Sequence, residues 1–135
     1  MTDLVVDASV FVYATTVTGP EVDALLARLA LATCHAPHLV DSEVGQALRR
    51  RERAGKITSE IALTSLKAAR HLISFRYPTA GPLGDSAWEL RGAISYYDAQ
   101  YVALATALNA TLVTGDARLS RAPGLPCAVE VVGQA

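Results

Sequence analysis

The chain has 135 residues, of which 51% are hydrophobic and 19% are charged, and its formal net charge is −1 at pH 7. This composition excludes a disordered chain and fits one domain over residues 1–135 with a buried core. No apolar stretch reaches the roughly 18 residues of a membrane span, and the N-terminus has no basic segment of a signal peptide, so we expect a cytosolic protein without membrane association. Because the net charge is close to zero, any binding of nucleic acid must come from a local basic patch.

The cysteines and histidines indicate neither a disulfide scaffold nor a zinc site. Cys34 and Cys127 are far apart in apolar surroundings, and we expect both to be small buried hydrophobic residues. The three histidines show no ligand spacing with the cysteines, and we expect ordinary polar or partly buried side chains: His35, His38 and His71.

The first half of the chain alternates between a strand pattern and helix patterns. Leu4-Val5-Val6 is a β-branched run that ends at Asp7, which predicts a buried parallel strand followed by a turn into the apolar run from Val10 to Ala14. A proline that suits a helix start opens an amphipathic helix at Pro20. A short link or strand over residues 34–36 and a helix from Leu39 to Ala54 follow.

The second half continues the alternation. Thr58 carries the cap pattern of a helix, with Ile61 among its inward residues, and residues 73–77 alternate as a strand does. We expect a helix from Asp85 through Trp88 to Ala93, with Trp88 in packing or in a subunit contact. The remaining expected elements are a helix ending near Asn109, a strand over 111–114, a helical turn over 117–121 and a strand over 128–132.

One stretch, residues 95–105, combines a helix start with an acid. Ser95 and Asp98 have the spacing of a capping box, and an apolar face follows at helical spacing. Asp98 would then lie in the first turn, near free backbone N–H groups and the positive end of the helix dipole. Asp98 could serve only as a helix cap, and taken alone it indicates no more than that.

Strands that alternate with helices throughout predict an α/β fold of parallel β-α-β units with helices on both faces of the sheet. In such a sheet, ligands bind outside the carboxyl ends of the strands. Asp7 ends the first strand, Asp116 follows the strand over 111–114 by one glycine, and Asp98 and Glu43 lie in the first turns of two helices. Each acid has a simpler explanation as a cap or a solvated side chain, but together they predict one meeting point.

A meeting point of four carboxylates requires a counter-ion. Two ionised carboxylates about 5 Å apart repel by roughly 3 kcal/mol at an effective dielectric constant near 20. Bound cations or raised pKa values relieve this repulsion, and a site made only of oxygen ligands suits Mg²⁺ or Mn²⁺. Such a site can ionise a water molecule and neutralise charge on a phosphodiester, so the predicted reaction is hydrolysis of a nucleic-acid backbone.

Arginines gather at the end of the helix expected over residues 39–54. Basic residues in a last turn are favoured by the helix dipole, so the run fits a solvated helix end. It also fits a patch that binds the RNA backbone. The candidate phosphate-binding residues are Arg49, Arg50, Arg53 and Lys56.

The chain resembles the PIN-domain ribonucleases, and most closely the VapC toxins of bacterial toxin–antitoxin pairs. The resemblance covers nearly the whole length and rests on four segments, each with one acid: Val5-Val6-Asp7-Ala8-Ser9, Glu43 with Ala47-Leu48-Arg49-Arg50, Tyr97-Asp98-Ala99-Gln100-Tyr101-Val102-Ala103-Leu104-Ala105, and Leu112-Val113-Thr114-Gly115-Asp116. No acid of the pattern is missing.

The resemblance implies a three-layer α/β/α domain with a central parallel sheet and metal-dependent endonuclease action on RNA. It implies that Mg²⁺, or Mn²⁺, is held by the catalytic acids Asp7, Glu43, Asp98 and Asp116, with Ser9 as a supporting hydroxyl. Members of this family are generally homodimers, and each is inhibited by an antitoxin, VapB, whose C-terminal segment reaches toward the active site. RNA, a VapB-type antitoxin and a second copy of the chain are therefore the expected partners.

Three other functions remain as alternatives. A binding module could use the acidic pocket for a basic peptide or a metal without turnover. A receiver-like phosphoacceptor domain also clusters acids at a sheet edge, but it requires a lysine near the last strand, and the chain has none after Lys67. A haloacid-dehalogenase-like phosphatase is disfavoured because Asp7-Ala8-Ser9 lacks a second acid two residues after the first.

Overall fold

The computed structural model describes residues 1–133 and contains one five-stranded sheet, in which every pair of neighbouring strands is parallel. The strands lie in the order β3-β2-β1-β4-β5. Their bounds are β1 Asp3–Val6, β2 Thr33–Pro37, β3 Phe75–Tyr77, β4 Thr111–Thr114 and β5 Val129–Val131. Because β1 has β2 on one side and β4 on the other, the strand order reverses beside β1, and the ends of β1 and β4 border the crevice where ligands bind in such sheets.

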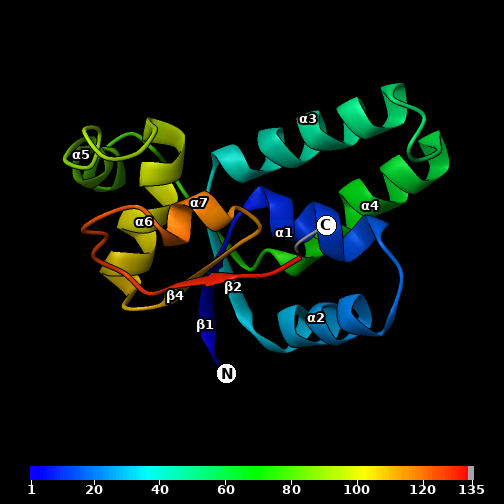
Figure 1. Cartoon of the computed structure of the whole chain (residues 1–135), viewed down its shortest axis with the longest axis horizontal. Coiled ribbons are helices and arrows are strands. Elements are labelled where there is room, and N and C mark those ends of the chain that lie inside the picture. The colour runs from blue at the N-terminus through cyan, green and yellow to red at the C-terminus, as the bar shows by residue number, and fades with distance from the viewer. Residues whose placement is uncertain (134–135) are drawn as a thin grey trace.

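Seven helices connect these strands within the described part of the chain. Their bounds are α1 Ala8–Thr16, α2 Pro20–Leu31, α3 Leu39–Arg53, α4 Ser59–Leu72, α5 Pro82–Trp88, α6 Tyr96–Leu108 and α7 Ala117–Ser120. Right-handed connections put the helices between β1 and β3 on one face and the helices between β3 and β4 on the other. Helix α6 accordingly packs against β1, β2 and β4, while α2 packs against β2. The expected three-layer α/β/α fold is confirmed (Figure 1).

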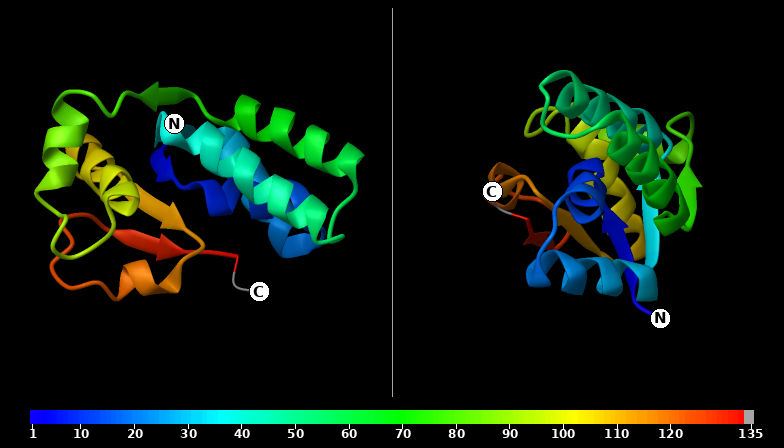
Figure 2. Two further views of the ribbon diagram at one scale, coloured as in Figure 1. Left: turned by 90° about the horizontal axis from the view of Figure 1, so that it is seen from above. Right: turned by 90° about the vertical axis from the view of Figure 1, so that its right-hand side faces the viewer.

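Helices α3 and α4 form an antiparallel pair that extends beyond the sheet, and α1 packs against both of them (Figures 1 and 2). The core of the molecule lies between this pair, the sheet and α6. Its fully buried side chains include Phe11, Val40, Val102 and Leu112. Among residues 1–133, no helix combines the length and the hydropathy that crossing a bilayer requires.

The helix expected from Asp85 to Ala93 has different ends. It begins at Pro82, because a proline fits the first helical position, and it ends at Trp88. Beyond Trp88 the backbone forms successive turns closed by hydrogen bonds between residues three apart. The amides of Leu90 and Arg91 donate to the carbonyls of Ala87 and Trp88, respectively. This segment therefore brings the chain to Ser95 as a compact turn instead of a continued helix.

Three side chains are more exposed than expected. Ile61 is 43% exposed, because the buried face of α4 is formed by Ala62, Ser65 and Ala69. Trp88 is 55% exposed, with the Arg91 guanidinium 4.5 Å from its ring centroid, so it does not pack in the core of this chain. Cys127 is half-buried, whereas Cys34 is buried as expected, and both thiols are free.

Candidate active site

Asp7 lies at the carboxyl end of β1, where the chain turns into α1. Its Oδ1 accepts a hydrogen bond from the Ser9 hydroxyl at 2.5 Å and one from the Val10 amide at 3.4 Å, so it also caps α1. Its Oδ2 accepts a hydrogen bond from the buried Thr114 hydroxyl. Burial raises the pKa of Asp7, and the nearby charge of Asp98 raises it further, although these hydrogen bonds oppose the shift.

The end of β4 is tied to Asp7 through Thr114 and Ser9. The Thr114 hydroxyl accepts from the Asp116 amide at 3.1 Å, and the Ser9 hydroxyl accepts from the Gly115 amide at 3.0 Å. A Cβ atom at Gly115 would lie 2.8 Å from Ser9 Oγ, so any other residue would displace the Ser9 hydroxyl from this position. The turn after β4 therefore carries Asp116 toward Asp7.

Glu43 enters the site from α3 and is held by Tyr101 of α6. The Tyr101 hydroxyl donates to Glu43 Oε1 at 2.6 Å. Burial raises the pKa of the Tyr101 phenol, so this group stays protonated and remains a donor. Burial also raises the pKa of Glu43, with further contributions from the charges of Asp7 and Asp98.

Asp98 lies in the first turn of α6, as expected. The Asp98 amide donates to the Ser95 hydroxyl at 3.1 Å, which makes Ser95 the N-cap. The Asp98 carboxylate is half-buried, and its pKa is raised by burial and by the charge of Asp116. Besides burial, the charge of Asp98 in turn raises the pKa of Glu43 on α3.

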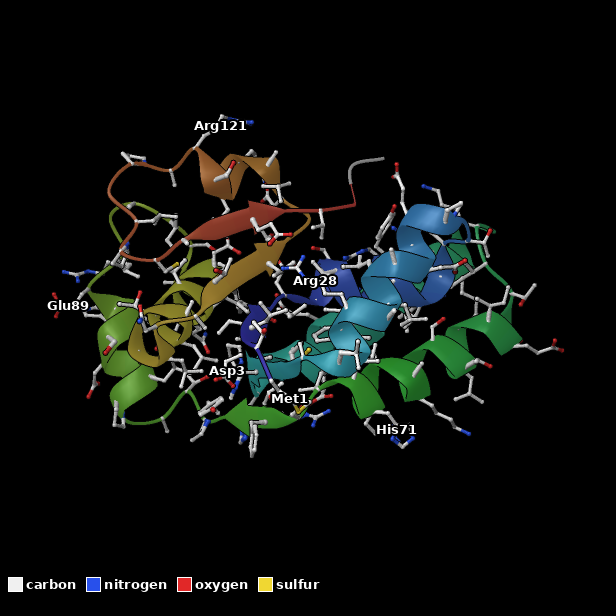
Figure 3. The ribbon with its side chains drawn as sticks, turned by 90° about the horizontal axis from the view of Figure 1, so that it is seen from below. Met1, Asp3, Arg28, His71, Glu89 and Arg121 are labelled. Atoms are coloured by element: carbon white, nitrogen blue, oxygen red, sulfur yellow. The ribbon has the colours of Figure 1, made fainter. Side chains whose placement is uncertain are left out.

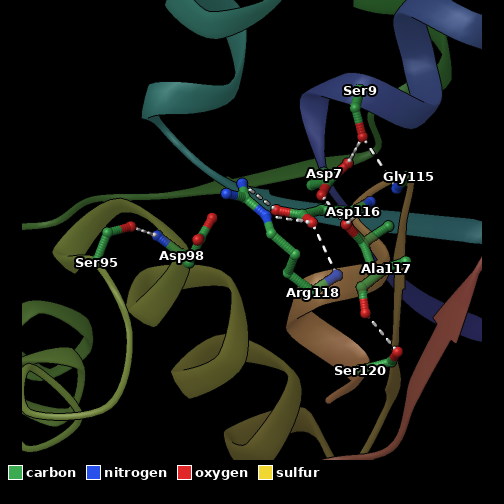
Figure 4. Close-up of polar contacts among 10 residues, drawn as sticks. Asp7, Ser9, Ser95, Asp98, Gly115, Asp116, Ala117, Arg118 and Ser120 are labelled. Atoms are coloured by element: carbon green, nitrogen blue, oxygen red, sulfur yellow. Dashed lines mark hydrogen bonds and ion pairs between the residues drawn. The ribbon is translucent and has the colours of Figure 1, made fainter. Parts of the chain in front are cut away.

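Asp116 is the N-cap of α7 and forms an ion pair with Arg118. The Arg118 Nε and Nη2 atoms donate to Oδ1 and Oδ2 at 3.1 and 2.9 Å, and the Arg118 amide donates to Oδ1 at 2.9 Å. This pair lowers the pKa of Asp116. In Figure 4 the guanidinium lies between the carboxylates of Asp98 and Asp116.

The four acids predicted from the sequence therefore lie at one edge of the sheet. Burial and neighbouring carboxylates raise the pKa values of three of them: Asp7, Glu43 and Asp98. As the side chains stand, no three Asp, Glu, His or Cys residues within residues 1–133 converge closely enough to hold a metal ion. Three carboxylates accept hydrogen bonds from side chains of their own: Asp7 from Ser9 and Thr114, Glu43 from Tyr101, and Asp116 from Arg118.

The chemistry of these side chains fits a hard divalent cation. All four are carboxylates, which are the ligands that Mg²⁺ and Mn²⁺ take in proteins. Three of them are held near one another with raised pKa values, and the Arg118 guanidinium, which pairs with the fourth, is 85% exposed. Side-chain rotations would be needed to turn the carboxylates toward one ion.

The expected basic residues divide between two surfaces of α3. Arg50, Arg51 and Lys56 line a hollow of about 440 Å³ that also contains Ser9. Arg49 lines a different hollow, of about 250 Å³, between α3 and α4, and Arg53 lines neither of these two. Of the four predicted residues, Arg50 and Lys56 therefore line the hollow that also contains Ser9, whose hydroxyl donates to Asp7.

Three residues of the site were not predicted from the sequence. Tyr101 and Thr114 stand within apolar runs, where a buried hydroxyl cannot be told from a packing residue. Arg118 follows Asp116 by two positions, a spacing that a short N-capped helix brings together. The sequence signal for Thr114 and Tyr101 was a hydroxyl inside an otherwise apolar run, and that signal does not separate a site residue from a packing residue.

Comparison with known proteins agrees with this geometry. The PIN-domain profile matches residues 4–125. Ribonuclease VapC1 of Mycobacterium tuberculosis is 46% identical over 132 residues, which is 98% of this chain and 99% of that protein. Ribonuclease VapC9 of the same organism is 43% identical over 104 residues, or 77% of this chain and 81% of that protein. The crystal structure of VapBC2 from Rickettsia felis, bound to promoter DNA, matches with a TM-score of 0.72 at 19% identity, covering 98% of this chain and 100% of that one.

Proposed function

Because the chain belongs to the PIN-domain family, and within it to the VapC ribonucleases, we propose that it is a Mg²⁺-dependent endoribonuclease and the toxin of a VapBC-type toxin–antitoxin pair. The observation that supports the proposal is the position of four acids at one sheet edge: at the end of β1, on α3, in the first turn of α6 and after β4.

In this proposal Asp7, Asp98 and Asp116 hold one or two Mg²⁺ ions, with Mn²⁺ as a substitute, and Glu43 helps to hold a metal or orients the attacking water. A bound ion supplies activation of that water and neutralisation of the charge that develops at the phosphodiester. Asp7 is kept in place by the hydroxyls of Ser9 and Thr114, and Glu43 by the phenol of Tyr101. These hydrogen bonds hold Asp7 and Glu43 at the sheet edge, within reach of a shared ion.

RNA would approach over the hollow next to Ser9. Arg50, Arg51 and Lys56 supply three positive charges there, which suits contacts to backbone phosphates on one side of the cut. Such contacts position the strand without reading its bases, so they fit an endonuclease whose sequence preference comes from other groups.

The test is cleavage of a 5′-labelled RNA by the full chain in Mg²⁺, in EDTA and after Asp98→Asn. We expect cleavage only in Mg²⁺, and a loss of at least about a hundredfold for Asp98→Asn. The variant should stay folded, because burial already disfavours the charge of Asp98 and the neutral amide is better tolerated there. Asp23→Asn in the first turn of α2 is the matched control and should cleave as the wild type does. Equal cleavage in Mg²⁺ and EDTA would refute the proposal.

A binding module without turnover is the second candidate, and the ion pair between Asp116 and Arg118 favours it. That pair shows that a guanidinium fits against the acids, so a basic peptide could bind there. Mg²⁺-dependent cleavage that is lost in EDTA separates the two functions.

The proposal also includes partners and location: a VapB-type antitoxin, a homodimer and the cytosol, where the RNA lies. The exposed Trp88 ring, which meets the Tyr96 ring edge-on, offers an apolar surface for a second copy. Growth of cells that express the chain with and without the adjacent reading frame tests for the antitoxin, and sedimentation equilibrium tests for the dimer.

A further inference from the structure

A second hollow, lined by two acids and two arginines, lies on the other side of Asp98 and Asp116 from Ser9 (Figure 4). It has a volume of about 510 Å³ and contains Asp98, Asp116, Arg118 and Arg121. Its volume falls in the range of roughly 300–1,000 Å³ that is usual for ligand pockets. Neither arginine was predicted from the sequence to belong to the site.

The two hollows flank the acids. The first is formed by α1 and the C-terminal half of α3, and the second by the start of α6 and by α7 with the turn after it. In Figure 4, Ser9 lies on one side of Asp7 and Asp116, and Ser95 and Asp98 lie on the other. A strand that crosses the acids therefore meets basic side chains before and after them.

The second hollow is electrostatically balanced only while the acids are charged and unliganded. Two acids and two arginines line it, and the Arg118 guanidinium is taken by Asp116. A divalent cation on the acids would leave two positive charges without an internal partner. The hollow would then attract an anion at the position next to the cut, and Arg118, which is 85% exposed, is free to move toward it.

The walls of the hollow favour a backbone over a base. The described residues that line it include Ile94, Leu119 and Pro123 but no aromatic side chain on which a base could stack. Arg121 is exposed and lies at the outer end of α7, pointing away from the protein in Figure 3. Its guanidinium is therefore accessible to a phosphate.

We propose that this hollow binds the phosphodiester backbone of the RNA substrate on the far side of the cut. Arg121 contacts one phosphate, and Arg118 leaves Asp116 to contact a second phosphate. The inference rests on the proposed ribonuclease function and adds a second binding subsite to it. It makes Arg118 a positioning residue that holds Asp116 while the site is empty and holds substrate while the site is loaded.

The RNA contact is tested by fluorescence anisotropy of a labelled single-stranded RNA with a nuclease-resistant backbone, in Mn²⁺ and at several concentrations of monovalent salt. Each phosphate contact contributes about 0.7 to the slope of log K against log salt for a single strand. We expect Arg121→Ala to lower the slope by about that amount and to weaken binding at low salt. The control is Arg70→Ala, which removes an exposed arginine from the end of α4, near the opposite edge of the sheet, and should leave the slope unchanged.

The exchange of Arg118 is tested by calorimetric titration of Mn²⁺ without RNA. Arg118→Ala should bind Mn²⁺ at least severalfold more tightly than the wild type, because Asp116 no longer has its internal partner. Arg121→Ala is the matched control, since it removes a charge that acts on Asp116 without a hydrogen bond to it. An equal gain in Mn²⁺ affinity for both variants would overturn the exchange.

The outcomes separate this inference from the function on which it rests. An unchanged slope for Arg121→Ala, together with a lowered slope for Arg50→Ala, would remove the second subsite and leave the ribonuclease proposal intact. Absence of Mg²⁺-dependent cleavage by the wild type would remove both. A lowered slope for Arg121→Ala in a chain that cleaves RNA supports both.

Discussion

At the scale of single residues, hydroxyl groups determine how the acids are held. Ser9 and Thr114 donate to the two oxygens of Asp7, and Tyr101 donates to Glu43. Two of these donors are themselves fixed, because Ser9 Oγ accepts from the Gly115 amide and Thr114 Oγ1 accepts from the Asp116 amide. The acids therefore have defined orientations at the sheet edge even though like charges surround them.

Tyr101→Phe removes the hydrogen bond to Glu43 with little change in volume. We expect the free energy of unfolding to fall by about 1–3 kcal/mol, because a half-buried carboxylate is left without its donor. Urea denaturation measures this change. In RNA cleavage, kcat should fall while KM changes little, since the carboxylate is misplaced while the arginine-lined hollows are untouched. Tyr13→Phe on α1 is the matched control, and an equally large fall in stability for that variant would contradict a specific role for Tyr101.

At the scale of elements, β1, β4 and the starts of α3 and α6 could be predicted because each has a local signal. A β-branched run that ends at an acid predicts a strand and its turn, as in Val5, Val6 and Asp7. The serine before Asp98 predicts the cap of α6. Since the carboxyl ends of parallel strands lie at one edge, these local patterns were enough to place the acids at the same edge of the sheet.

The rotation of α3 about its axis could not be predicted in the same way. Its apolar face is broad enough to be covered by both α1 and α4, and only this packing decides that Arg50 and Arg51 turn toward Ser9 while Arg49 turns toward α4. The ion pair of Arg118 with Asp116 depends likewise on the short α7 helix, whose start was predicted but whose side-chain contacts were not.

Two double variants of this region test the assignment of the α3 surfaces. Arg50→Ala with Lys56→Ala should lower the salt slope of RNA binding in EDTA by about 0.7 for each phosphate that these two side chains bind. Arg49→Ala with Arg53→Ala removes the same charge from other positions and should leave the slope near that of the wild type. If the Arg49 and Arg53 double variant lowers the slope as much as the Arg50 and Lys56 double variant, the charge of the whole helix end binds RNA, and the hollow beside Ser9 is not a specific binding site.

At the scale of the whole molecule, the fold brings four acids from distant parts of the chain to one edge and leaves them without a full complement of positive charge. Burial and mutual repulsion raise the pKa values of Asp7, Glu43 and Asp98, so their folded-state pKa values lie above the unfolded values. The free energy of unfolding therefore falls as the pH rises from the unfolded-state to the folded-state pKa values of these acids, because the unfolded chain gives up its protons first. A bound divalent cation would reverse this effect, since it favours the charged carboxylates in the folded state alone.

The central claim is that Asp7, Glu43, Asp98 and Asp116 share one metal site, and calorimetric titration of Mn²⁺ into the full chain and its single variants tests it most directly. We predict that Asp7→Asn, Glu43→Gln, Asp98→Asn and Asp116→Asn each weaken Mn²⁺ binding by about tenfold or more, while Asp23→Asn on α2 binds as the wild type does. Wild-type affinity for Mn²⁺ after Asp98→Asn or Asp116→Asn would contradict the claim.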